Sequence, residues 1–227
     1  MLVGTKQRLS KCRKLILENV ILETVEVSKL LGVNIDCCLT WSNHLELLAN
    51  KISKKLGVLK CLKPFMSGDA LLKVYNCIIF PHFNYCCIVW SGAKHSSNID
   101  RLLKLQKRAA RIILNVSEIT TPSSILFQNL KWMPINDYFV YRKCILTYKV
   151  LLNTRVFECF QYVSQVSSRI TRQGVNNLLF VPKAKTEYYR RSFVISSCNL
   201  WNNMSNEMRE STSLEFFKTK YLNEYFN

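Results

Sequence analysis

Clustered carboxylates, adjacent aspartates and a glycine-rich phosphate loop are all missing from this sequence of 227 residues. A two-metal phosphoryl-transfer site needs acidic side chains that are held close together. Here the 15 acidic residues are scattered singly, and no spacing among them predicts a pair of Mg²⁺ ions. Acids that are distant in the sequence can still meet in a folded chain. The sequence itself predicts no catalytic residue and no metal site.

Cysteine motifs are missing as well, although the chain has ten cysteines. None forms a C-x-x-C pair, and the doublets 37–38 and 86–87 lack zinc-site spacing. His82, the doublet 86–87 and His95 make the one metal-like group, but they stand in an aromatic run that favours a buried core. A Cys–His pair for nucleophilic catalysis has no local signature here. We expect reduced, mostly buried thiols.

The sequence shows no targeting or membrane-spanning pattern. Its first residues become charged at Lys6, which argues against a secretory leader. The longest apolar run, 77–90, is interrupted by Pro81, His82 and Asn84 and is too short to cross a bilayer. We therefore expect an intracellular protein, nuclear or cytoplasmic, without a membrane partner.

Basic residues are abundant, because 32 Lys and Arg against 15 Asp and Glu give a net charge of +17. Such an excess favours a nucleic-acid partner. The segment 97–115 concentrates it: at about 100° per residue, its apolar and basic side chains separate onto two faces. The basic face carries Arg101, Lys104, Lys107, Arg108 and Arg111. This amphipathic helix fits a contact with a polyanion or a solvated surface helix, and binding to an anionic membrane surface ranks last.

The fold class follows from the periodicity of the apolar residues. Aliphatic runs at 14–17, 24–27 and 30–36 predict strands, with Gly32 at a bulge or a close backbone approach. Helices are predicted over 43–62, 67–80, 82–90, 97–115, 125–130, 135–152, 191–204 and 214–226, with a loop at 161–185 that contains a strand at 177–181. We expect an α+β fold that is predominantly α-helical: short N-terminal strands or a β-hairpin, a helical bundle and further C-terminal helices. The predicted segments are 1–40, 41–116 and 117–227.

Two further basic groups accompany the segment 97–115. Lys51, Lys54 and Lys55 lie off the apolar stripe of the helix predicted at 43–62. Arg190 and Arg191 stand among aromatic residues, and cations that neutralise phosphates beside rings that stack on bases are typical of nucleic-acid binding. Core positions are favoured for the nearby rings of Phe193 and Trp201, and for the two arginines contact and solvation stay equally open.

A series of short motifs runs through nearly the whole chain. It consists of 30–36 (LLGVNID) with Leu39, Trp41 and His44; 81–86 (PHFNYC) with Trp90; 105–112 (LQKRAARI); Tyr148 and Lys149 with Leu152 and Asn153; 189–193 (YRRSF) with 200–202 (LWN); and Phe217 with Lys218. In this order the motifs resemble the C-terminal part of reverse transcriptases from non-LTR retrotransposons of the LINE type, which are jockey-like. Each motif is short, and the shared order carries the resemblance.

The resemblance implies a separate role for each part of the chain. Residues 1–40 would be the end of the palm, with Leu31, Gly32 and Val33 where such enzymes hold the primer end. Residues 41–116 would be a thumb that grips the template–primer duplex. The paired metal-binding aspartates of the family would lie upstream of Met1, so Mg²⁺ would belong to that missing palm and no cofactor is expected in this chain. The missing palm segment is then an implied protein partner.

The resemblance and the residues leave three functions open. The first is a fragment of an RNA-directed DNA polymerase that at most binds an RNA, DNA or hybrid duplex through its phosphates. The second is an active polymerase, either complete with acids that meet only in the fold or working with a separate palm chain. The third is a structural or protein-interaction fragment, or a non-functional remnant of a mobile element.

Overall fold

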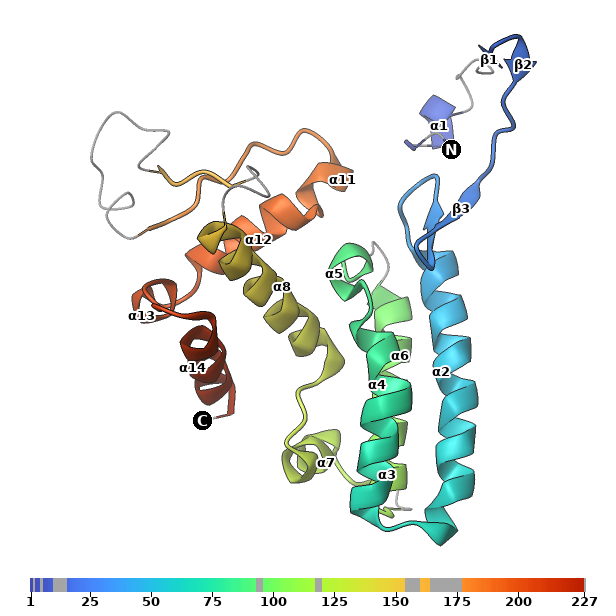
Figure 1. Cartoon of the computed structure of the whole chain (residues 1–227), viewed down its shortest axis with the longest axis vertical. Helices are drawn as coiled ribbons and strands as arrows, with labels where there is room; N and C mark the ends of the chain where they lie inside the picture. Colours follow the sequence, from blue (N-terminus) through green and yellow to red (C-terminus); the bar gives the residue numbers. More distant parts are fainter. Residues whose placement is uncertain are drawn as a thin grey trace. The chain divides into compact units, whose positions relative to one another are not determined.

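The computed structural model describes residues 1, 3–4, 6–9, 16–92, 96–116, 120–153, 160–163 and 177–226. It divides into two compact units, Met1–Asn136 and Asp137–Asn227. The fold is α+β and predominantly helical, as predicted, with two short β-hairpins near the N-terminus followed by helices (Figure 1). The motif-based segments 1–40, 41–116 and 117–227 remain predictions. Within the described residues, no helix combines the length and the apolar character that crossing a membrane requires.

The N-terminal unit begins with a short helix and two antiparallel hairpins. The helix α1 (Lys6–Leu9) was not predicted from the sequence. β1 (Ile16–Leu17) pairs with β2 (Val20–Ile21), and β3 (Val27–Leu30) pairs with β4 (Val33–Asp36). The strand expected over 24–27 is therefore wrong except for its last residue, where β3 begins.

A two-residue turn divides the segment 30–36, which was predicted as one strand. Leu31 has a φ of 46° and Gly32 a φ of 81°. Positive φ at both central residues is the geometry that matches the twist of a tight hairpin. Glycine adopts this geometry freely, whereas leucine does so at a steric cost. The prediction is thus corrected: Gly32 serves a hairpin turn, and not a bulge.

The carboxylate of Asp36 organises the connection from the second hairpin to the helices. It accepts hydrogen bonds from the backbone N–H groups of Cys38 (3.1 Å), Thr40 (2.9 Å) and Trp41 (2.7 Å). Trp41 itself has a φ of 63° and offers no side-chain cap to the helix that follows. Asp36 therefore fixes the backbone that leads into that helix.

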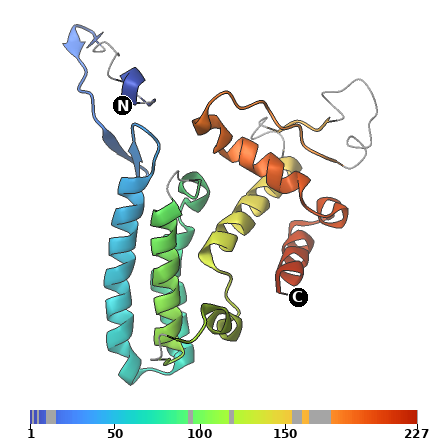
Figure 2. The ribbon, with the colours of Figure 1, turned by 180° about the vertical axis from the view of Figure 1, so that it is seen from behind.

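Three helical segments pack into the bundle that follows. The first is α2 (Ser42–Leu62), and η1 (Lys63–Phe65) leads from it to the second. The second runs through α3 (Gly68–Val74), the π-helix η2 (Tyr75–Ile79) and α4 (Phe80–Asn84). The third is α6 (Ser96–Ile113), which lies beside α2 in both views (Figures 1 and 2). The predicted stripe of α2 is confirmed, since it buries Leu45, Leu48, Ile52, Leu56 and Leu59.

Pro81 was expected to bend or end the second segment, but the helix continues past it. Proline lacks an N–H and crowds the preceding turn, so the backbone before it widens. The N–H of Phe80 accordingly donates to the carbonyl oxygen of Tyr75, five residues back. The widened turn lets the chain keep helical geometry as far as Asn84.

The helix predicted over 82–90 is broken after Asn84. Tyr85 is extended and Cys86 has a φ of 50°, and the short helix α5 (Cys87–Trp90) follows. The predicted core positions of Phe83, Cys87 and Trp90 are confirmed, whereas Cys86 is half-buried. Across this break, the Trp90 indole N–H donates to the carbonyl oxygen of Tyr85 (3.1 Å).

The helix α7 (Ser123–Leu130) closes the N-terminal unit. It buries Leu126 and Phe127 against Ala110 of α6. After it, the Trp132 ring stacks on the Tyr75 ring, with centroids 4.3 Å apart. The N-terminal unit thus extends beyond the bundle to Asn136.

The C-terminal unit is built on α8 (Ile135–Leu152), whose predicted bounds are confirmed. It continues through α11 (Glu187–Arg190), α12 (Phe193–Asn202), α13 (Asn206–Arg209) and α14 (Leu214–Phe226). α11 and α13 were not predicted, and in the described part of 177–181 the expected strand is a single bridge between Leu179 and Tyr162. The core stacks the Tyr148 and Phe217 rings 4.6 Å apart. The predicted burial of Trp201 is confirmed, and Phe193 is half-buried.

Candidate nucleic-acid interface

The basic helix α6 is oriented by its buried face, which includes Leu102, Ala109 and Ala110. On the same face lies Gln106, a buried polar residue. Its amide donates to the carbonyl oxygen of Met133 (2.9 Å) and accepts from the N–H of Ile135 (2.8 Å). Both hydrogen-bonding groups of the amide are thus satisfied by backbone beyond α7, which fixes the rotation of α6 about its axis.

This rotation leaves three basic side chains exposed in a row along α6. Arg101, Lys104 and Arg108 are exposed, at spacings of three and four residues that keep them on one side of a helix. Arg101 donates to the Oδ1 atom of Asn50 on α2 (2.7 Å), so the row runs beside α2. Among the described residues, neither Lys104 nor Arg108 forms an ion pair. We call Arg101, Lys104 and Arg108 the basic row.

Two members of the predicted basic face lie outside this row. Lys107 and Arg111 are half-buried. A guanidinium nitrogen of Arg111 donates to the carbonyl oxygen of Thr121 (3.3 Å), in the segment that leads into α7. Arg111 therefore contributes to holding α7 in place and is less available to a ligand than the sequence pattern suggested.

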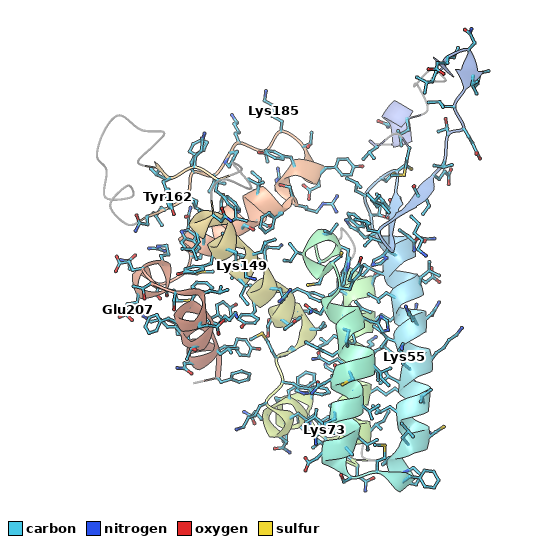
Figure 3. All side chains as sticks on the ribbon, in the orientation of Figure 1. Lys55, Lys73, Lys149, Tyr162, Lys185 and Glu207 are labelled. Atoms are coloured by element: carbon cyan, nitrogen blue, oxygen red, sulfur yellow. The ribbon has the colours of Figure 1, made fainter. Side chains whose placement is uncertain are left out.

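The second predicted set, on α2, is divided between two sides of that helix. Lys51 and Lys54 are exposed. Lys55, which Figure 3 labels on α2, is half-buried. Burial lowers the pKa of His82 on α4, and the charges of Lys51 and Lys55 lower it further. These two lysines therefore lie toward α4, whereas Asn50 lies toward α6. Lys54 follows Asn50 by four residues, so it lies on the side of α2 that contacts Arg101.

The residues predicted to hold a primer end form the tip of the second hairpin. Leu31 is 81% exposed, while Val33 is buried. The hydroxyl of Tyr85 donates to the carbonyl oxygen of Leu31 (2.6 Å), and its ring lies against Gly32. The turn is thus tied to the segment between α4 and α5.

Arg190 and Arg191 already have an acidic neighbour. Arg190 lies 3.3 Å and Arg191 3.7 Å from the carboxylate of Glu187, one turn earlier. The guanidinium of Arg191 also lies over the Tyr188 ring, 5.6 Å from its centroid. An approaching phosphate would compete with Glu187 at both residues, which makes them weaker candidates than the basic row.

The histidines serve packing in the described part of the chain. His44 is buried at the start of α2, where its Nδ1 accepts from the N–H of Asn34 (3.4 Å) and its ring tilts against Trp90. Burial lowers the pKa of His44. Within the described residues no three His, Cys, Asp or Glu side chains gather where a metal ion would bind. His95, part of the metal-like group of the sequence, lies outside the described residues.

Sequence reasoning missed Gln106, Asn50 and Tyr85 as positioning residues. Gln106 carried a usable signal, because a glutamine on the apolar side of an amphipathic helix has to be hydrogen-bonded once buried. Asn50 and Tyr85 carried none, since their partners lie 51 and 54 residues away in the sequence.

Comparisons with known proteins add no name to this geometry. No protein-family model, no curated protein and no solved structure gives a significant match to the chain.

Proposed function

We propose that this chain binds nucleic acid through the phosphate backbone, as a fragment of an RNA-directed DNA polymerase of the non-LTR retrotransposon type that does not catalyse synthesis by itself. The basic row beside α2 is the observation that carries the proposal. Its members are exposed, and only three acidic residues, Glu46, Asp69 and Asp100, occur between positions 42 and 116. The proposed location is nuclear or cytoplasmic, where such a partner is present.

The dimensions of the basic row suit a phosphate backbone. A helix rises about 1.5 Å per residue, so the row from Arg101 to Arg108 extends over about 10 Å. One strand of duplex DNA carries a phosphate every 3.4 Å or so along its axis, and the row therefore spans about three phosphates. Contacts of this kind neutralise charge without reading bases, as a polymerase that accepts any template requires.

Charge reversal tests the basic row against a matched control. The double variant Lys104→Glu, Arg108→Glu changes net charge by four and leaves the Arg101–Asn50 contact in place. Lys183→Glu, Lys185→Glu makes the same change at two exposed residues of the C-terminal unit, where Lys185 points away from the chain (Figure 3). In gel shifts with a heteroduplex, we expect the first pair to weaken binding by about tenfold or more and the second much less. Equal weakening by both pairs would contradict the proposal.

Salt dependence measures the same contacts in another way. Lys104→Gln with Arg108→Gln should lower the slope of log affinity against log salt by about 1.8, because two phosphate contacts are lost. An affinity that stays flat between low and moderate salt would be incompatible with backbone binding. A random-sequence duplex should bind as well as any chosen sequence.

Primer extension separates binding from catalysis. We expect the chain alone to incorporate no nucleotide on an RNA template with a DNA primer. Incorporation that disappears when Mg²⁺ is removed would favour the second hypothesis, an active polymerase.

A protein-interaction role is the second candidate, and the first hairpin favours it. Ile16, Leu17, Val20 and Ile21 are all at least 59% exposed, which is unusual for four adjacent aliphatic side chains. A separate palm segment is the proposed partner. If this role is correct, Ile16→Lys with Val20→Lys should abolish association with such a segment while leaving nucleic-acid binding intact, as sedimentation and gel shifts would measure.

A further inference from the structure

The C-terminal unit contains a cavity of about 330 Å³. It lies between α8, α14 and the turn from α12 to α13, and all of its lining residues belong to this unit. Ligand sites in proteins have volumes of this order, with mostly apolar walls and a few polar groups. The cavity shares no residue with the basic row.

The walls of the cavity are rich in sulfur and aromatic rings. Cys144, Met204 and Met208 supply the sulfur, and Tyr221 and Tyr225 supply the rings. Burial raises the pKa of the Cys144 thiol to about 12, and it also raises the pKa of Tyr221. The deep wall is therefore neutral. Thioethers and tyrosine rings both make favourable contacts with an aromatic guest.

The cavity carries a carboxylate in its lining, although the chain as a whole carries a charge of +17. Glu224 is the one charged side chain in the lining. Its carboxylate accepts a hydrogen bond from the Ser205 hydroxyl (3.2 Å), and the Tyr225 hydroxyl donates to the carboxylate of Asp137 (2.5 Å). Among the described residues, neither Glu224 nor Asp137 forms an ion pair, and the nearby Lys220 is paired with Glu207.

We infer that this cavity binds an aromatic group that carries a cation. The ring would lie against the sulfur atoms and tyrosine rings, and the cation would reach the Glu224 carboxylate. A cavity of about 150 Å³ is enough for benzene, so a volume of about 330 Å³ can hold a ring together with a short aminoalkyl chain. The same chemistry occurs in a free aromatic amine and in a peptide where an aromatic residue stands beside Lys or Arg.

Calorimetric titration of the full chain with tryptamine tests this inference. Indolepropionate has the same ring with the opposite charge and serves as the matched probe. We expect saturable binding of tryptamine at millimolar concentration or below, and weaker binding of indolepropionate. An acetylated, amidated Trp-Lys dipeptide distinguishes the two sources: tighter binding than tryptamine would indicate a peptide, and weaker binding a free amine. Absence of saturable tryptamine binding would refute the inference.

Two variants locate the binding site. Glu224→Gln should weaken tryptamine binding roughly twofold to fivefold, because the carboxylate is exposed, and should leave indolepropionate binding unchanged or improved. Glu210→Gln, an exposed residue outside the lining, is the control and should change nothing. Met204→Trp fills the cavity and should remove binding of both probes. Tryptamine binding that survives Met204→Trp, in a chain whose circular dichroism is unchanged, would contradict the inference.

Discussion

The Tyr85 hydroxyl donates a hydrogen bond of 2.6 Å to the carbonyl oxygen of Leu31, although the two residues are 54 positions apart. This contact joins the tip of the second hairpin to the segment between α4 and α5. Tyr85 can reach the tip because the chain leaves helical geometry at Tyr85 and Cys86. Two of the motifs that carry the family resemblance therefore meet at one hydrogen bond.

Removing the Tyr85 hydroxyl should destabilise the hairpin of β3 and β4 and have little effect on the rest of the chain. Tyr85→Phe is expected to lower the local stability of the hairpin more than the global free energy of unfolding, because the bond is exposed. Hydrogen exchange of the β3 and β4 amides should become faster. Tyr189→Phe, at another exposed tyrosine, is the control. Unchanged exchange in β3 and β4 would show that the bond does not hold the turn.

Relieving the backbone strain at Leu31 should stabilise the chain. A left-handed conformation costs an ordinary L-residue about 1–2 kcal/mol, and asparagine tolerates it better than leucine. Leu31→Asn should therefore raise the free energy of unfolding by about 0.5–1 kcal/mol in urea titrations. Leu30→Asn, at the last residue of β3, should lower the free energy of unfolding, because asparagine is unfavourable in strands. A loss of stability in Leu31→Asn would mean that the exposed leucine side chain has a contact of its own.

Acidification should destabilise the N-terminal unit through His44. Its pKa is lowered in the folded chain by burial, so the folded state favours the neutral ring. The stability that this provides is complete above the unfolded value of about 6.5 and is lost as the pH falls below it. Protonation also ends the role of Nδ1 as acceptor for the Asn34 N–H.

Urea titrations between pH 7.5 and about 5 would measure this dependence. His44→Gln should reduce the pH dependence of the unfolding free energy, even though it lowers stability at neutral pH. His82→Gln provides the comparison, because burial and two lysines lower the pKa of His82 in the same direction. If neither variant changes the dependence, other groups are responsible for it.

Loss of the Gln106 amide should lower the free energy of unfolding. Gln106→Leu keeps most of the buried volume but leaves the Met133 carbonyl and the Ile135 N–H without their partner. Each of the two unsatisfied groups costs about 1–3 kcal/mol, so we expect a loss of roughly 2–6 kcal/mol in thermal or chemical unfolding. Leu103→Ala, on the half-buried edge of the same helix, should cost less. A neutral Gln106→Leu would show that water satisfies both groups.

The long helices could be predicted from the sequence because each has a continuous apolar stripe and a clear end. The stripe from Leu45 to Leu59 and the Pro134 that precedes α8 are local signals. The errors arose where a distant partner decides the backbone. The turn at Leu31 and the break at Tyr85 and Cys86 are joined by a hydrogen bond between distant segments, and neither leucine nor cysteine indicates a positive φ.

The candidate site shows the same limit. Periodicity placed Arg101, Lys104 and Arg108 on one side of α6, where the structure also has them exposed. It could not tell that Arg111 is engaged with Thr121, or that Glu187 lies beside Arg190 and Arg191 in a helical turn that was not predicted. The sequence gives the number of basic residues, whereas the contacts in the folded chain determine which of them are available to a ligand.

The π turn before Pro81 has a consequence for how this chain tolerates insertions and deletions. Leu71, Tyr75, Ile79 and Phe83 are buried at strict intervals of four, longer than the 3.6-residue repeat of an α-helix. The wider turn holds the surplus residue that this interval requires. Deletion of the exposed Cys77 would remove the surplus residue and keep the flanking buried residues in phase, at the cost of the wider turn before Pro81. The helix can therefore shorten by one residue at this position without turning its buried side to water.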